Sequence, residues 1–334
     1  MVKLLQLLLT YKFRTTQPAQ KNGGFTLIEL LVGLILAFLV IIPLLGFMVN
    51  LLGTDRQEQA KANSEQELQA AADYIARDVE QAIYIYDGHG LGKIQTGLPT
   101  VTNSVPVLAF WKRQIIPKVI PVGNSTACQN QTDCDDAFVY SLVVYYLTQS
   151  DATCASGTWS CTARIQRVQL RDAVKVKKAN GETIIQPKDD GFVLFNPEFA
   201  ASEEDSMNAW PYGAPTAGAK DPQVLIDYID QTPLPANTPW CPPIKRKRAL
   251  LPTGYDPTTA SQVPVTPAST GFLACVDVEN TTAQISIRGN SLARIQKKTS
   301  NPPQYSSDKS VATYFPTVRI QVQGRGVFKI NQKS

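Results

Sequence analysis

The sequence has a single histidine among its 334 residues, and only 18% of its residues are charged. Most general-base, catalytic-triad and zinc-hydrolase designs use imidazole, so one histidine excludes most of that enzymology. His89 lies in a glycine-rich stretch, residues 87–92, which we interpret as a solvated turn directly after a helix. Carboxylate-based chemistry is not excluded, but no constellation of residues indicates it. We therefore expect a protein that is not an enzyme and that holds no cofactor.

Acidic residues are missing from the first 24 positions, which carry Lys3, Lys12, Arg14 and Lys21. Without these four, 28 basic side chains face 28 acidic ones, so the rest of the chain is neutral. A neutral body does not favour a large nucleic-acid surface. The basic run Lys245–Arg248 is interpreted as a solvated loop, and contact with DNA or an anionic glycan is the alternative.

One apolar run, residues 25–52, contains Glu29 as its only charge. As a helix it spans about 42 Å, enough to cross a hydrocarbon core of about 30 Å. The basic residues before it predict a cytoplasmic N-terminus and an exported chain after Leu52. A secretory signal would place small residues after the apolar run, whereas Gly23 and Gly24 precede it. A carboxylate near the bilayer costs about 2.5–3.5 kcal/mol, so we expect Glu29 to have a positive partner, such as a free amine at Phe25.

The residues KNGGFTLIELLV, Lys21–Val32, resemble the processing site of type IV prepilins and type II secretion pseudopilins. The resemblance implies that a prepilin peptidase cuts after Gly24 and methylates the new N-terminal residue, Phe25. It also implies that Glu29 pairs with the terminal amine of a neighbouring subunit during assembly. The implied partners are other pilins or pseudopilins, an inner-membrane assembly platform and its motor ATPase.

Pro43 interrupts the apolar run and removes one helical hydrogen bond. We expect a kink or a local melt around residues 39–43. In filaments of the resembled family a comparable proline lies in a stretch that loses helicity, which implies a similar melt here.

After the apolar run, residues 54–86 change to a polar helical pattern with one apolar stripe. The stripe consists of Leu68, Ala72, Ile75, Val79, Ala82 and Tyr86, and charged residues, Asp78 among them, occupy the other faces. The stripe favours a helix half buried on a sheet, continuous from Phe25 to Tyr86. We expect an α+β, pilin-like fold, in which a long N-terminal helix packs on antiparallel sheet with large irregular loops.

Downstream the pattern predicts strands, several with the alternation of an antiparallel sheet that has one wet face. They are Val105–Trp111, Phe138–Leu147, Thr162–Leu170, Gly271–Glu279, Thr282–Arg288 and Thr317–Gln323. Arg164, Arg167 and Arg319 are interpreted as solvated charges on wet faces. The proline-rich stretches 232–243 and 251–267 are interpreted as surface loops.

Four segments follow from these patterns: a cytoplasmic leader at 1–24, a transmembrane and filament-core helix at 25–52, an amphipathic helix at 53–86, and an exported β-rich domain at 87–334. The stretch Tyr74–Ala82, followed by strands, resembles the J-type minor pseudopilins and the W-type minor pilins. The overall layout also resembles the pseudopilins of cyanobacterial hormogonium polysaccharide secretion. These resemblances imply a minor subunit, at or near a filament tip.

All six cysteines follow the apolar run, and an even number in an exported domain favours disulfides. Six cysteines allow fifteen connectivities. Local spacing favours Cys128 with Cys134 and Cys154 with Cys161, which leaves Cys241 for Cys275. A zinc site is less favoured, because no pair has C-x-x-C spacing.

Two further patterns resemble ligand sites. Residues 133–136 and 189–190 hold aspartates that could bind calcium, but neither matches an EF-hand loop, and solvated turns are preferred. Residues 88–93 have three residues between glycines instead of four and lack the Ser or Thr that follows the lysine of a phosphate loop, so that interpretation is rejected.

The predicted function is that of a minor pilin or pseudopilin, processed by prepilin peptidase and assembled into a pilus-like or secretion filament. The filament would support secretion, for example of polysaccharide, or motility. The alternative is a binding module at a filament tip, an adhesin or a subunit that binds DNA or glycan through Lys245–Arg248.

Overall fold

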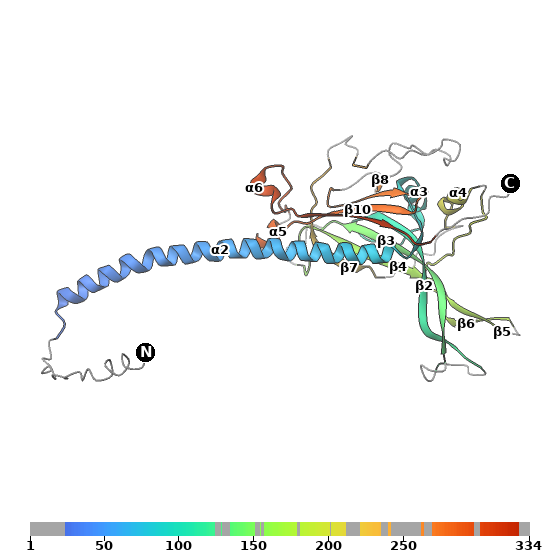
Figure 1. Ribbon diagram of the computed structural model, residues 1–334, viewed down its shortest axis with the longest axis horizontal. Helices are drawn as coiled ribbons and strands as arrows, with labels where there is room; N and C mark the ends of the chain where they lie inside the picture. Colours follow the sequence, from blue (N-terminus) through green and yellow to red (C-terminus); the bar gives the residue numbers. More distant parts are fainter. Residues whose placement is uncertain are drawn as a thin grey trace, which may run out of the picture. The chain divides into compact units, whose positions relative to one another are not determined.

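The computed structural model describes residues 24–123, 128, 134–150, 154, 157–178, 181–200, 202–211, 221–234, 240–241, 262–263, 269–296 and 301–326. The chain divides into two compact units, residues 1–55 and residues 56–334. Helix α2, Leu27–Val79, begins in the first unit and ends in the second (Figure 1). The leader up to residue 23 and the basic run Lys245–Arg248 lie outside the described residues.

The first unit consists, in its described part, of the start of α2 and the three residues before it. The helix is long and apolar enough to cross a membrane, and none of its most apolar 18-residue window is buried. Its large apolar side chains between Leu27 and Leu52 are all about half exposed or more. An apolar surface of this length suits lipid or other apolar helices rather than water.

The second unit contains two main antiparallel sheets, which share one hydrophobic core with the second half of α2. The larger sheet has the order β1-β2-β3-β4-β7 and the smaller one β11-β10-β9-β8. Their strands are β1 Ala82–Ile85, β2 Ser104–Pro121, β3 Cys134–Thr148, β4 Ala163–Arg171, β7 Gln223–Ile229, β8 Gln262–Val263, β9 Phe272–Asp277, β10 Thr282–Arg288 and β11 Thr317–Gln323. The expected α+β class, with a long N-terminal helix and antiparallel sheet, is confirmed.

Shorter elements complete the described part of the second unit. A separate hairpin pairs β5, Val174–Lys178, with β6, Gly181–Gln186. The short helices are α3 Gly88–Ile94, η1 Gln95–Gly97, α4 Glu203–Asn208, α5 Leu292–Ile295 and α6 Lys309–Ala312. The segment around α4 covers one face of the larger sheet, where Trp111 meets Phe192, Phe195 and Trp210 edge to face.

The apolar stripe that the sequence predicts on the helix is the face that is buried in the core. Leu68, Ala72, Ile75 and Val79 are each at most 1% exposed, and Leu68 also packs closely against Gly289 beside β10. At the surface, Arg294 of α5 pairs with Glu67 of α2, and Arg325 after β11 pairs with Glu80, which directly follows the helix. The second half of α2 is therefore an integral layer of this unit.

The predicted end of the helix at Tyr86 is wrong. The helix ends at Val79, and Ala82–Ile85 forms edge strand β1, paired antiparallel with residues 110–112 of β2. Isoleucine and tyrosine fit a pleated, half-buried surface well, and here pairing with β2 outweighs continued helix. Tyr86 is fully buried, and its hydroxyl accepts from the indole N–H of Trp111 at 3.0 Å.

Strands β10 and β11 match the predicted ranges, whereas β2 and β3 extend well beyond theirs. β2 continues to Pro121 and β3 begins at Cys134, so the two strands project past the larger sheet (Figure 1). Strands β1, β5, β6, β7 and β8 were not predicted. Most of them are short, and their pairing partners are distant in sequence or lie on an exposed hairpin.

Candidate functional sites

The start of α2 is built by Thr26. Its carbonyl accepts from the backbone N–H groups of Glu29 and Leu30 at 3.0 and 3.2 Å, and its hydroxyl accepts from that of Glu29 at 3.4 Å. Thr26 followed three residues later by Glu29 has the spacing of a capping box. The Glu29 carboxylate therefore lies in the first turn, where the helix dipole stabilises negative charge.

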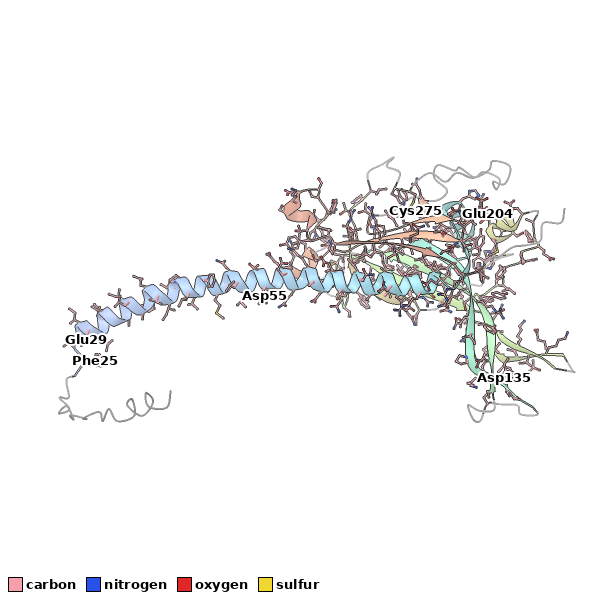
Figure 2. The ribbon with its side chains drawn as sticks, viewed as in Figure 1. Phe25, Glu29, Asp55, Asp135, Glu204 and Cys275 are labelled. Carbon is pink, nitrogen blue, oxygen red and sulfur yellow. A yellow bond between two sulfur atoms is a disulfide. The ribbon has the colours of Figure 1, made fainter. Side chains whose placement is uncertain are left out.

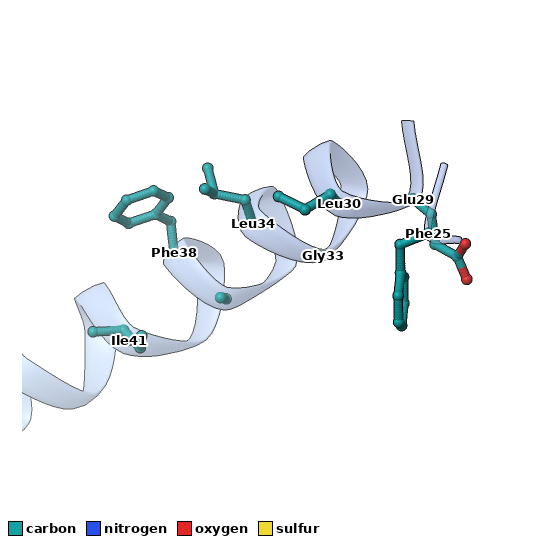
Figure 3. Close-up of a pocket in the computed structure, with 8 residues that line it drawn as sticks. Phe25, Glu29, Leu30, Gly33, Leu34, Phe38 and Ile41 are labelled. Carbon is teal, nitrogen blue, oxygen red and sulfur yellow. The ribbon is translucent and has the colours of Figure 1, made fainter. Parts of the chain in front are cut away.

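Phe25 and Glu29 mark one end of a hollow along this helix face (Figures 2 and 3). The hollow is lined by Phe25, Glu29, Leu30, Gly33, Leu34, Ala37, Phe38 and Ile41. All these residues belong to α2 except Phe25, which lies two residues before it, so this one segment supplies only one wall. Gly33 and Ala37 follow Glu29 at four-residue steps, and small residues at this spacing let a second helix approach closely. The geometry suits an apolar helix that brings a positive charge to Glu29.

Gly24 is not required by the fold around it. A Cβ added at this position meets no atom within 4 Å. Neither crowding nor close backbone approach therefore explains a glycine here.

Pro43 lies within a helix that is continuous from Leu27 to Val79. No melted stretch is present at residues 39–43 in this structure. A melt in an assembled filament stays a prediction.

A buried charge cluster forms where the second half of α2 meets the larger sheet, outside the apolar run. The Asp78 carboxylate accepts from Lys112 Nζ on β2 at 2.6 Å, from the Tyr145 hydroxyl on β3 at 2.8 Å and from Arg167 Nε on β4 at 2.8 Å. The side chains of Asp78, Lys112 and Arg167 are 6%, 8% and 9% exposed. One helix carboxylate thus reaches three adjacent strands.

Electrostatics keep this cluster charged. Burial by itself would raise the pKa of the Asp78 carboxyl, but the hydrogen bonds and charges of Arg167 and Lys112 outweigh burial and hold that pKa below its ordinary value. Burial, and then the Asp78 charge, raise the pKa of the Tyr145 phenol, which therefore stays protonated. Lys112 and Arg167 both contact the one carboxylate of Asp78, in a site that is nearly closed to solvent. The cluster attaches the helix to the sheet.

Two sequence interpretations are corrected here. Arg167 is not a solvated charge on a wet face, and Asp78 does not lie on a polar face of the helix, because both are buried in this cluster. Arg164 is half-buried, with its guanidinium 5.9 Å from the ring centre of Trp159. Arg319 is exposed, as expected. The sequence separations of 34, 67 and 89 residues between Asp78 and its partners explain why local patterns do not find the cluster.

The predicted turn around His89 is also wrong, because Gly88–Ile94 is helix α3, which follows strand β1. Asp87 caps this helix by accepting from the backbone N–H of Gly90 at 2.8 Å. Burial and the charge of Lys93 lower the pKa of His89, so its imidazole is neutral near pH 7. It lies in a structural helix–strand junction.

The cysteines form three disulfides, Cys128–Cys134, Cys154–Cys161 and Cys241–Cys275. These are the three pairs that sequence spacing favours. The first two close loops of six and seven residues, and the third joins Cys241 to strand β9, 34 residues away. None of the six cysteines is free.

Within the described ranges, no group of three or more His, Cys, Asp or Glu side chains could hold a metal ion. Two aspartates considered for calcium are bound to backbone instead. Asp136 accepts from the N–H of Lys118, and Asp189 accepts from the N–H of Arg171. Asp133 and Lys245–Arg248 lie outside the described residues, so the preferred interpretations as a solvated turn and a solvated loop, with calcium and nucleic acid as the alternatives, stay untested.

In comparisons with known proteins, no protein-family model, no curated protein and no solved structure matches this chain.

Proposed function

We propose that this chain is a membrane-anchored, pilin-like subunit that is cut after Gly24 and joins a filament through Phe25–Leu52. The carrying observation is the start of α2, where Gly24, Phe25 and Thr26 precede an exposed apolar helix with a single carboxylate in its first turn. Cutting after Gly24 would create an amine at Phe25, beside Glu29.

Three features support this proposal. The fold around Gly24 does not need a glycine, whereas a processing enzyme can. The apolar half of α2 supplies one wall of a hollow that a second helix can complete. The other half of α2 is tied into a disulfide-containing domain, which suits export from the cytoplasm.

In this proposal the precursor spans the inner membrane once, with its N-terminus in the cytoplasm and residues after Leu52 outside. Prepilin peptidase cuts and methylates it, and it packs with other pilins or pseudopilins on an assembly platform that a motor ATPase drives. The charge of Glu29 pairs with the terminal amine of a neighbour. The filament supports secretion, with polysaccharide as one cargo class, or motility, and this chain acts as a minor subunit.

The test is the intact mass and N-terminal sequence of the full chain, purified from membranes of cells with and without prepilin peptidase. The proposal predicts a chain that starts at methylated Phe25 in the first case and the full precursor in the second. A Gly24→Ala variant should stay uncut in both, while its domain folds normally. The same uncut wild-type chain from both cells would refute the proposal.

A further inference from the structure

The outer parts of β2 and β3 form an arm that leaves the larger sheet. β1 pairs with β2 only at residues 110–112, and β4 pairs with β3 only at residues 141–148. Residues 113–121 and 134–140 continue alone as a two-stranded ribbon, which we call the arm. Figure 2 shows Asp135 near its far end.

One face of the arm is covered by the chain itself. Val119, Ala137 and Val139 form a small second core with Val174 of β5 and partly buried Ile185 of β6. The free edge of β2 is blocked as well, because Pro117 cannot donate and Lys118 has a positive φ of 55° within an irregular stretch of pairing between Ile116 and Ile120. A partner strand therefore cannot extend the ribbon at this edge of β2.

The other face presents apolar side chains to solvent. Ile115 and Phe138 oppose each other across the two strands, and they are 49% and 59% exposed. The guanidinium of Arg113 lies 4.0 Å from the centre of the Phe138 ring. An exposed aromatic ring with an arginine stacked on it has the composition of an interface centre rather than of ordinary surface.

Charges flank this apolar pair on both sides. Arg113 lies two residues before Ile115 on β2, opposite Tyr140 of β3, and no ion pair of Arg113 is found in the part of the chain that the structure describes. Asp136 is two residues from Phe138 in the other direction, on the same face by strand alternation, and it is exposed. Along the arm the order is therefore positive, apolar, negative.

We infer that this face of the arm, formed by Arg113, Ile115, Asp136 and Phe138, binds the same face of a second copy of this chain. A two-fold axis through the Ile115–Phe138 pair would bring Arg113 of each copy onto Asp136 of the other. A two-fold interface needs this kind of self-complementary pattern. The inference goes beyond the proposed function and does not depend on processing at Gly24.

The face is small beside the about 800 Å² that each partner buries in a standard interface. Pairing is therefore weak in dilute solution, and anchoring in one membrane supplies the effective concentration that it needs. The experiment belongs in membranes, with the full chain.

The first measurement is oxidative cross-linking of Ile115→Cys in membranes. All six native cysteines are in disulfides, so the new thiol is the only free one. A position beside a two-fold axis should give a covalent homodimer. Ile184→Cys on β6 is the matched control, because Ile184 is 61% exposed but lies on the separate hairpin. A dimer yield at Ile184 equal to that at Ile115, or cross-linking of Ile115→Cys only to other proteins, would overturn the inference.

The second measurement is a charge exchange in the Ile115→Cys chain. Arg113→Glu alone or Asp136→Arg alone should lower the dimer yield about fivefold, because attraction becomes repulsion at two symmetric contacts. The double variant should restore the yield. Differently tagged single variants, expressed together, should form the mixed dimer in preference to either homodimer, since both contacts are then complementary.

Thermal unfolding of each variant checks that the exposed substitutions leave the fold intact. Folded single variants that cross-link as well as the parent, or a double variant that does not recover, would exclude the two-fold arrangement. Cross-linking in cells without prepilin peptidase should equal that in cells with it. Failure of processing and failure of pairing are therefore separate results.

Discussion

The two halves of α2 are one continuous helix with opposite surroundings. From Leu27 to Leu52 its side chains are exposed and, apart from Glu29 and Asn50, not polar. From Arg56 to Val79 the helix buries a stripe in a two-sheet core and anchors a buried carboxylate. The first half is therefore suited to contact lipid or other apolar helices, whereas the second half packs on this chain's own core.

The largest difference in domain stability between substitutions in the two halves of α2 is expected at Asp78. Asp78→Ala leaves Lys112 and Arg167 buried without their counter-charge, so we expect the domain to lose about 3–5 kcal/mol of unfolding free energy. Chemical denaturation of the full chain in detergent, followed by tryptophan fluorescence, measures it. The control is Glu29→Ala in the first half, which should leave domain stability unchanged. A loss below about 1 kcal/mol for Asp78→Ala would mean that the cluster does not attach the helix to the sheet.

Two leucines, one in each half of α2, should give the next largest difference in domain stability. Leu68 is 1% exposed and Leu34 is 51% exposed on the same helix. Leu68→Ala should cost about 2–5 kcal/mol through lost burial and a cavity, while Leu34→Ala should not change the unfolding of the domain. Equal effects of the two substitutions in the same denaturation assay would contradict the division of the helix into two environments.

Acid should weaken the attachment of the second half of α2 to the sheet through Asp78. The folded pKa of Asp78 lies below the ordinary 3.8, so the stability that its charge contributes is present above that value and is lost as pH falls through the folded pKa. The stability difference between wild type and Asp78→Asn should therefore shrink as the pH is lowered from about 5 toward 3. Thermal unfolding of both proteins across this range tests it, and a difference that grows with acid would show that the sign is wrong.

The smallest effect on stability is expected at Glu29, where function should change instead. Glu29→Gln keeps the size of an exposed side chain, so the melting temperature should stay within the error of the measurement. If Glu29 pairs with a neighbour's amine as proposed, recovery of the chain in sheared filaments should fall strongly, because the substitution removes the negative charge of that pair. Glu58→Gln, an exposed glutamate in the second half, serves as control and should leave recovery unchanged. Normal filament recovery for Glu29→Gln would remove the assembly role from this residue.

Sequence reasoning succeeded where the signal is local. The period of Leu68, Ile75 and Val79 identifies the buried helix face, because residues three and four apart share one side. Alternation identifies β10 and β11 to the residue, since both strands have one core face and one wet face. The favoured cysteine pairs are those present, because two of them are close in sequence.

Sequence reasoning failed where distant segments compete with a local pattern. Ala82–Ile85 continues the helical period, but pairing with β2 makes it a strand. Asp78 and Arg167 look like surface charges, because hydrophilic residues usually are, and only the approach of three strands to the helix end buries them. The arm was not predicted either, since the added length of β2 and β3 comes from their pairing with each other.

The sequence by itself determined the apolar run, its single carboxylate, the glycine–phenylalanine junction before it and the buried stripe that follows. These depend on side-chain chemistry and on the fixed periods of helix and strand. Only the tertiary structure decided where the helix stops, which charges are buried and which face of the arm is left open. Each of these depends on contacts between segments far apart in the chain, and the energy of such a contact cannot be obtained from either segment alone.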